Sequence, residues 1–153
     1  MKRVLLTGMS GTGKSSVVRE LRGMGFRAID MDEPGWSVQD AKGNQLWCED
    51  HLREVLTSKD GGHVFVSGCA ENQLKFYSLF THIILLSAPP AVIRERLATR
   101  TNNPYGKRPD QLEEVFRNME KIEPLLRRRA THEIETTKPL AEVVASVLST
   151  VKS

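Results

Sequence analysis

Short apolar runs alternate with longer stretches of helical periodicity along the chain. The runs are rich in Val, Ile and Leu and are bounded by Gly, Pro or polar residues, which is typical of strands buried in a parallel sheet. They predict strands at residues 4–7, 26–29, 64–67, 83–87 and 132–135. Apolar residues at helical spacing predict helices at residues 14–22, 45–57, 73–79, 91–99, 109–129 and 139–152. This alternation predicts an α/β fold with a five-stranded parallel sheet and helices on both faces.

No internal repeat, low-complexity tract or linker interrupts this pattern. A length of 153 residues is enough for one domain with a hydrophobic core and too short for two ordinary domains. We therefore expect residues 1–153 to form a single domain. Within the fifth predicted helix, Pro124 is expected to kink or shorten the helix, because proline cannot donate the backbone hydrogen bond.

The loop after the first predicted strand matches every fixed position of the phosphate-binding pattern G-x-x-x-x-G-K-[ST], and its residues are Gly8, Met9, Ser10, Gly11, Thr12, Gly13, Lys14 and Ser15. Its glycines let backbone amides and a helix N-terminus point at an anion. We expect this loop and Ser16 to bind a nucleoside triphosphate, with Lys14 at the β- and γ-phosphates and the Ser15 hydroxyl on Mg²⁺. The alternative is a glycine-rich turn that only starts a helix.

Two carboxylates, Asp30 and Asp32, follow the second predicted strand. Ligands of parallel sheets bind beyond the carboxyl ends of the strands, so both should lie at the edge that holds the phosphate-binding loop. Alternate residues of an extended segment point to one side. We expect one carboxylate to hold hydrated Mg²⁺ and the other to face a second substrate. The alternative is a pair of ordinary turn acids that lead into Pro34 and Gly35.

The third predicted strand leads into Gly68 and Cys69, where the missing side chain of the glycine lets a ligand approach the backbone. Glu71 and Asn72 stand before the next predicted helix, and we expect them to cap its N-terminus. Farther along, residues 100–109 combine Asn, Pro and Gly with several cations and predict a flexible lid. Closure of this lid would exclude water from a phosphate site. A charged surface loop without function is the alternative.

The amino-acid composition indicates where the protein is expected and which partners it lacks. Hydrophobic residues make up 39% and charged residues 27%, and no apolar stretch is long enough to cross a bilayer, so we expect no membrane partner. A strand predicted from residue 4 leaves no room for a signal peptide, so we expect a cytoplasmic protein. Cys48 and Cys69 stand apart without zinc-ligand spacing, which is typical of reduced thiols.

The net charge of +3 and the pI of about 9.0 reflect basic residues concentrated between Arg94 and Arg129. Few aromatic residues lie among them for base stacking, so we expect no nucleic-acid partner. We interpret the run Arg127–Arg129 as the solvated last turn of a helix, where cations are favoured by the helix dipole.

These motifs together resemble the small P-loop kinases of the shikimate kinase, gluconate kinase and adenylate kinase type. The resemblance covers nearly the whole chain, although only the phosphate-binding loop is highly specific. It implies a three-layer P-loop NTPase fold with a small lid and substrate-binding helices, and it implies ATP and Mg²⁺ as cofactors. Shikimate kinases carry D-x-D after strand two, which implies that Asp30 serves Mg²⁺ and that Asp32 contacts the acceptor hydroxyl.

The resemblance also suggests residues for the acceptor. An E-x-x-[FL]-R motif, matched by residues 49–53, implies that Arg53 holds an acid group within an acceptor-binding segment at residues 32–60. The glycine-rich triplet of the family reads Gly68-Cys69-Ala70 here, which implies that Gly68 and Cys69 line the acceptor. The R-x-P-L-Y element of the family begins with Ile122, and an aliphatic side chain cannot pair with a carboxylate. We therefore expect an acceptor other than shikimate.

For the nucleotide, the resemblance implies that Arg100 and Arg108 clamp the phosphates from the lid. It implies an adenine-binding loop at Thr137, Lys138 and Pro139. We expect a kinase of a small hydroxylated metabolite, present as a monomer or homodimer, in which Lys14, Asp32 and Arg108 are catalytic.

Two alternatives to a kinase remain open. One is a nucleotide-dependent switch or ATPase without an acceptor, and the other is a nucleotide-binding protein that has lost catalysis. Residues 32–35 match the D-x-x-G of GTPases, but no N-K-x-D motif for guanine follows.

Overall fold

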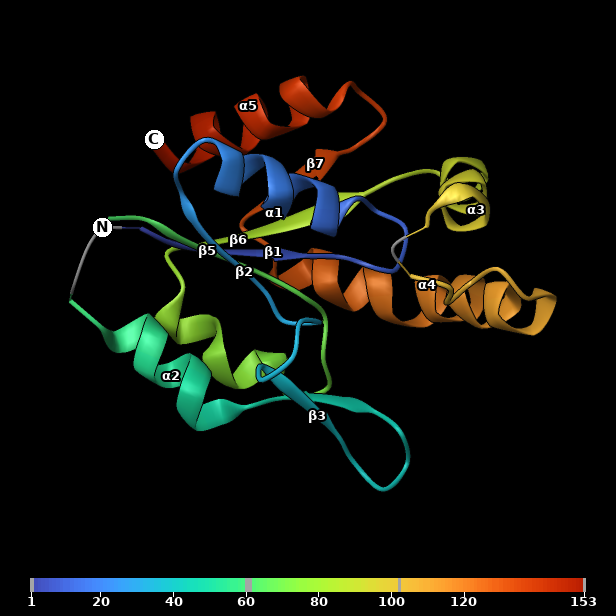
Figure 1. Ribbon diagram of the computed structural model, residues 1–153, viewed down its shortest axis with the longest axis horizontal. Coiled ribbons are helices and arrows are strands. Elements are labelled where there is room, and N and C mark those ends of the chain that lie inside the picture. The colour runs from blue at the N-terminus through green and yellow to red at the C-terminus, as the bar shows by residue number, and fades with distance from the viewer. Residues whose placement is uncertain (1, 60–61, 102, 153) are drawn as a thin grey trace.

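A five-stranded parallel sheet forms the centre of the protein in a computed structural model that describes residues 2–59, 62–101 and 103–152 (Figure 1). Its strands stand in the order β2-β5-β1-β6-β7. Their bounds are Arg3–Thr7 for β1, Arg27–Asp30 for β2, Val64–Ser67 for β5, His82–Ser87 for β6 and His132–Glu135 for β7. Every pairing in this sheet is parallel. The predicted α/β fold is therefore confirmed.

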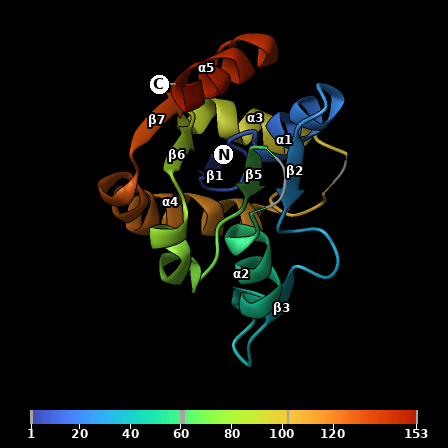
Figure 2. The same ribbon diagram turned by 90° about the vertical axis from the view of Figure 1, so that its left-hand side faces the viewer.

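Helices cover both faces of the sheet (Figures 1 and 2). On one face lie α1 (Lys14–Gly23) and α5 (Leu140–Lys152). On the other lie α2 (Glu49–Thr57), the 3₁₀ helix η1 (Gln73–Leu79) and α4 (Pro109–Arg129). The remaining helix, α3 (Pro90–Thr99), packs through Ile93 and Leu97 against Val115 of α4.

Alternation along β1 explains these layers. Val4 and Leu6 belong to the core cluster under α1 and α5, whereas Leu5 belongs to the cluster under α2 and η1. All three side chains are fully buried. Because the five strands are parallel, their carboxyl ends meet at one edge of the sheet, where the phosphate-binding loop leaves β1.

The helix predicted at residues 45–57 is wrong in its first part. Gln45–Trp47 forms β4, which pairs antiparallel with β3 (Ser37–Gln39), and α2 begins only at Glu49. The turn between the two strands is closed by Asp40, whose Oδ1 accepts hydrogen bonds from the amides of Lys42 (2.8 Å) and Asn44 (2.9 Å). This local turn chemistry overrides the helical spacing of the apolar residues.

Two further predictions about helices are corrected. The segment Gln73–Leu79 is a 3₁₀ helix, and α4 runs without a break past Pro124 to Arg129. The helix therefore has the predicted bounds, and of the two effects expected at Pro124 shortening does not occur. Within the described residues, no helix is both long and apolar enough to span a lipid bilayer.

Candidate active site

The loop between β1 and α1 is built for close approach of an anion. At Gly8, a Cβ atom would lie 2.4 Å from the carbonyl oxygen of Leu86, so a side chain does not fit there. Gly13 adopts a φ of 98° immediately before α1, a left-handed conformation that favours glycine. No side chain caps the N-terminus of α1, and its first turn carries no acidic residue. The free amides of this turn therefore fit a phosphate group.

Lys14 lies within this loop. Its Nζ donates hydrogen bonds to the carbonyl oxygens of Gly8 (2.6 Å) and Met9 (2.9 Å). Burial lowers the pKa of Lys14, because the ammonium group loses contact with water, while Cys69, Asp32 and Asp30 act in the opposite direction. The cation is thus positioned beside the amides that would hold phosphate, as the motif predicts.

Ser15 and Asp30 meet at the start of α1. The Ser15 hydroxyl donates to Oδ2 of Asp30 (3.2 Å), and the amide of Asp32 donates to Oδ1 of the same carboxylate (2.9 Å). Burial raises the pKa of Asp30. Within the described ranges, no group of three or more His, Cys, Asp or Glu side chains is placed to hold a metal. The hydroxyl and carboxylate oxygens of Ser15 and Asp30 are the kind of ligand that Mg²⁺ takes in nucleotide sites, where phosphate oxygens and water complete the coordination.

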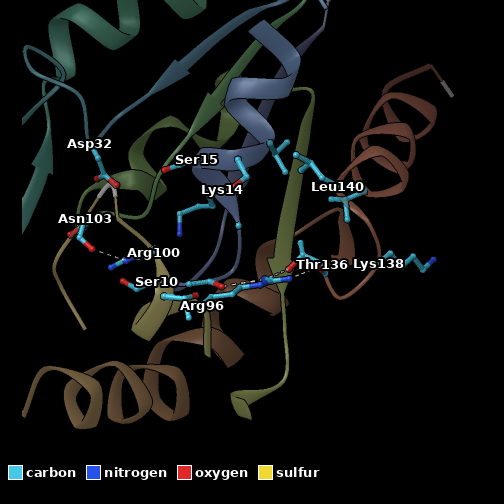
Figure 3. A pocket seen from close by; sticks show the side chains of 16 residues that line it. Ser10, Lys14, Ser15, Asp32, Arg96, Arg100, Asn103, Thr136, Lys138 and Leu140 are labelled. Carbon is cyan, nitrogen blue, oxygen red and sulfur yellow. Dashed lines mark hydrogen bonds between the residues drawn. The ribbon is translucent and has the colours of Figure 1, made fainter. Parts of the chain in front are cut away.

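A first cavity of about 390 Å³ opens beside the loop (Figure 3). We call it the nucleotide cavity, and the expected nucleotide-binding residues that line it are Ser10, Gly11, Gly13, Lys14, Ser15, Ser16, Arg100 and Lys138. Two other expected residues, Thr137 and Pro139, do not line it. The Thr137 hydroxyl instead donates to Oε1 of Glu135 (3.2 Å). Thr12 is buried below the loop, where its hydroxyl donates to the Met9 carbonyl (2.8 Å).

Arg96 joins the two walls of the nucleotide cavity. Its Nη1 donates to the carbonyl oxygen of Gly11 (3.2 Å) and to Oγ1 of Thr136 (2.8 Å), as Figure 3 shows. The Thr136 hydroxyl in turn donates to the Thr12 carbonyl (2.7 Å). Sequence reasoning gave Arg96 no role in the site. One feature of the sequence could have suggested a role for Arg96: it stands one helical turn before Arg100, which also lines the cavity.

The two lid arginines differ in position. Arg100 donates through Nε to the carbonyl oxygen of Asn103 (3.1 Å) and through Nη2 to that of Tyr105. Arg108 lies outside both cavities, with an exposed side chain that pairs with Asp110 (3.1 Å). The structure therefore brings only Arg100 to the nucleotide cavity. Asn102 of the expected lid and Asp60 of the expected acceptor segment lie outside the described residues.

A second cavity of about 610 Å³, which we call the acceptor cavity, lies on the other side of the loop. Ser10, Lys14 and Asp32 line both cavities. Gly8 and Met9 line only the second, as do residues of η1 and of the C-terminal half of α4. The three shared side chains thus stand where the contents of the two cavities would meet.

The acceptor residues expected from the sequence are only partly brought together. Cys69 lines the acceptor cavity, and burial raises the pKa of its thiol. Gly68 does not line it. A Cβ at this position would lie 2.9 Å from Cβ of Met31 and 3.1 Å from Cζ2 of Trp47. The close packing of Met31 and Trp47 explains why this position is glycine. Arg53 also lies outside the cavity, with its guanidinium group 5.4 Å from the centre of the Phe76 ring.

Several lining residues were missed. Gln45 of β4 donates through Nε2 to Oδ1 of Asp32 (2.8 Å) and to Oγ of Ser37 (3.1 Å). Arg128 and Arg129 are exposed in the last turn of α4, as the sequence suggested, and they also line the acceptor cavity. Ile122 lines it too, so the position that is arginine in the R-x-P-L-Y element does face this site.

Asn72 was expected to cap η1, and this expectation is wrong. No side chain caps that helix. The Asn72 side chain instead accepts from the amide of Trp47 (2.9 Å) and donates to Oε2 of Glu49 (3.2 Å). It therefore fixes the junction between β4 and α2, on the wall of the acceptor cavity that carries Gln45.

Comparison with known proteins extends the picture. A family model described as "AAA domain" matches residues 4–123. A protein of Archaeoglobus fulgidus named "Putative adenylate kinase" is 30% identical over 145 residues, which cover 94% of this chain and 79% of that protein. A "Nucleotide-binding protein" of Thermosipho africanus is 32% identical over 114 residues, which cover 74% of this chain. This chain spans only 40% of the length of the Thermosipho protein.

Kinases are among the solved structures that have the same fold. Shikimate kinase from Bacteroides thetaiotaomicron superposes with a TM-score of 0.70 at 20% identity and covers 99% of both chains. A gluconokinase from Sinorhizobium meliloti superposes with a TM-score of 0.62 at 22% identity and covers 99% of this chain and 91% of its own. These likenesses show the fold.

Proposed function

The chain belongs to the AAA domain family, and on that premise we propose that it is a phosphotransferase that moves the γ-phosphoryl group of ATP to a hydroxyl group of a small metabolite. The observation that carries the proposal is the sharing of Ser10, Lys14 and Asp32 between two cavities. A donor in the nucleotide cavity and an acceptor in the acceptor cavity would meet at these side chains. An enzyme that only hydrolyses nucleotide has no need of the larger second cavity.

The phosphate groups would lie against the loop amides and the uncapped N-terminus of α1. Ser15 and Asp30 would hold Mg²⁺, which when bound neutralises charge on the β- and γ-phosphates. Lys14 would exchange its two carbonyl partners for phosphate oxygens, so that its charge faces the phosphoryl group as negative charge develops. Arg96 and Arg100 border the same cavity, and burial lowers the pKa of both without removing their charge at neutral pH.

Asp32 would act on the acceptor. Gln45 holds one of its carboxylate oxygens, which orients the group at the boundary of the two cavities. The acceptor oxygen would attack the γ-phosphorus while the bond from that phosphorus to the β–γ bridging oxygen breaks. Asp32 would take the hydroxyl proton, and ADP would leave with the bridging oxygen. Arg108 would contribute only if the lid closed, because its side chain now pairs with Asp110.

A second candidate is phosphorylation of a nucleoside monophosphate. The naming of the Archaeoglobus relative favours it, since an adenylate kinase uses a phosphate oxygen of a nucleotide as acceptor. The two candidates share the donor site and differ in what occupies the acceptor cavity.

Product analysis tests the proposal. The purified chain is incubated with Mg²⁺ and ATP alone, with AMP, or with a panel of hydroxylated metabolites, and ADP, phosphomonoester and inorganic phosphate are quantified. We expect one hydroxylated compound to stimulate ADP release at least about tenfold, with one phosphomonoester formed per ADP. Two ADP formed per AMP consumed would support the second candidate. If ADP and inorganic phosphate form at the same rate with and without an acceptor, both candidate functions are contradicted. The Lys14→Ala variant is the control for contaminating enzymes.

A further inference from the structure

The acceptor cavity has two chemically different ends. At the end beside the phosphate-binding loop lie Lys14, Asp32 and Gln45. The backbone carbonyl oxygen of Gln45 also accepts a hydrogen bond from the backbone amide of Glu71 (3.2 Å). Burial is the main cause that raises the pKa of Cys69, and Asp32 and Glu71 add to the rise, so both of these carboxylates lie near Cys69 at this end of the cavity. The α4 wall runs from Asn118 to the last turn of the helix, a length of about 16 Å at 1.5 Å per residue.

Apolar side chains form the wall between the ends. Ile122, Leu125 and Leu126 come from α4, and Leu74 and Tyr77 come from η1. Leu74 is 55% exposed and Leu125 is 56% exposed, so more than half of each side chain is in contact with water. An apolar group placed between them would remove this surface from water.

Two arginines of the last turn of α4, Arg128 and Arg129, mark the far end, where Arg129 acts electrostatically on Tyr77. Arg127 is held away from the cavity by Glu123 (3.0 Å) and Glu133 (2.8 Å). Arg128 and Arg129 line the cavity, and within the described part of the chain neither has a hydrogen-bond or ion-pair partner. Two arginines at one end, and two carboxylates beside the single cation of Lys14 at the other, would orient a ligand that carries a negative charge.

We propose that the acceptor is an amphipathic hydroxylated anion, with the reacting hydroxyl at one end, an apolar body the size of a ring, and an oxyanion at the other end that binds Arg128 and Arg129. This assignment rests on the proposed function. It also opposes a nucleoside monophosphate acceptor, whose phosphate would have to lie at the end that carries Asp32 and Glu71.

Two fluorescent probes with the same ring framework test the subsite. One is 8-anilinonaphthalene-1-sulfonate, and the other is its uncharged counterpart N-phenyl-1-naphthylamine. We expect the double variant Arg128→Gln/Arg129→Gln to bind the sulfonate about tenfold more weakly and the uncharged probe as well as the original chain does. Leu125→Asn should weaken binding of both probes, because it interrupts the apolar wall. The matched control is Arg117→Gln, since Arg117 is exposed on the same helix and pairs with Glu113 outside both cavities.

Equal affinity of the double variant and the original chain for the sulfonate would overturn the assignment, and so would a matching loss for the uncharged probe. Titration of the same variants with Mg²⁺ and ATP separates this result from the proposed function, because the nucleotide cavity contains neither arginine. Arginine-dependent sulfonate binding without acceptor-stimulated ADP release would support the anion subsite and contradict the kinase. Acceptor-stimulated release with arginine-independent sulfonate binding would support the kinase and contradict the subsite.

Discussion

The two cavities share one loop but are built in different ways. The nucleotide cavity is enclosed by backbone groups and by side chains that bond to them, such as the buried Thr136 and the partly buried Arg96. The acceptor cavity is enclosed largely by side chains from the β3–β4 hairpin, η1 and α4, several of them exposed. A site made from the backbone of one short segment requires few residues of fixed type. A site made from side chains of distant segments changes with each of them, which allows one fold to accept different substrates.

The strongest test of this difference is Asp32→Asn, which should affect only the acceptor reaction. Loss of the proton acceptor should slow transfer by about 10²–10⁴-fold. Nucleotide affinity should stay close to normal, because Ser15 and Asp30 remain. Steady-state kinetics with an acceptor and calorimetric titration of Mg²⁺ and ATP measure the two quantities, and Asp50→Asn on the exposed start of α2 is the control. An unchanged kcat would remove Asp32 from the reaction.

Lys14→Ala tests the nucleotide side of the comparison. Removal of a preorganised cation from the phosphate site should lower kcat by about 10²–10³-fold. Thermal unfolding should change little, since the hydrogen bonds of the Lys14 side chain to described residues go to two carbonyl oxygens of its own loop. Lys152→Ala, at the exposed end of α5, serves as the control. A folded Lys14→Ala protein with full turnover would contradict the assignment of the phosphate-binding loop.

The lid arginines allow a finer comparison. Arg100→Ala should weaken nucleotide binding about tenfold, because the residue lines the nucleotide cavity. Arg108→Ala should leave that affinity unchanged, since its side chain lies outside the cavity, and should lower kcat if the lid closes during transfer. Calorimetry and kinetics on the two variants distinguish these effects. Equal losses of affinity in both variants would show that this description of the lid is wrong.

The smallest effects concern stability and pH. Burial raises the pKa of Asp30, so its folded-state pKa lies above the unfolded value of about 3.8 and its ionisation costs stability above the folded pKa. Asp30→Asn should therefore raise the free energy of unfolding at neutral pH without Mg²⁺. The gain should disappear as the pH falls through the folded and then the unfolded pKa. Asp30→Asn should also raise the Mg²⁺ concentration needed for nucleotide binding.

Asp40 in the hairpin turn is the matched control with the opposite sign. Hydrogen bonds, chiefly from Asn44, lower the pKa of Asp40, so its ionised form contributes stability that is lost as the pH falls through the folded pKa. Asp40→Asn should therefore slightly lower the free energy of unfolding at neutral pH. Urea unfolding of both variants across the acid range measures the two effects, and shifts of the same sign would contradict this electrostatic account.

The sequence predicts the fold and the phosphate-binding loop better than it predicts the acceptor cavity. The strands, their parallel arrangement, the phosphate-binding loop and the kinase-like resemblance are confirmed, because buried apolar runs and fixed glycines are local signals. The hairpin was missed because Leu46 and Trp47 also fit helical spacing, and only the turn around Asp40 decides between the two structures.

The acceptor cavity was harder to predict. Gly68 matched a ligand-binding glycine, but its role is to admit Met31 and Trp47. Arg128 and Arg129 resembled an ordinary helix end, because nothing in their local sequence shows that η1 lies opposite them. Such residues are assigned only when segments far apart in the chain are seen together.

The fate of the γ-phosphoryl group tests the central claim most directly. Phosphorus-31 NMR can follow the chain with Mg²⁺, ATP and a hydroxylated acceptor identified from the panel. We predict a phosphomonoester resonance that grows at the rate at which ADP appears, with no matching growth of inorganic phosphate and no signal from Asp32→Asn on the same time scale. Inorganic phosphate as the sole new product, formed at a rate independent of the acceptor, would contradict transfer between the two cavities.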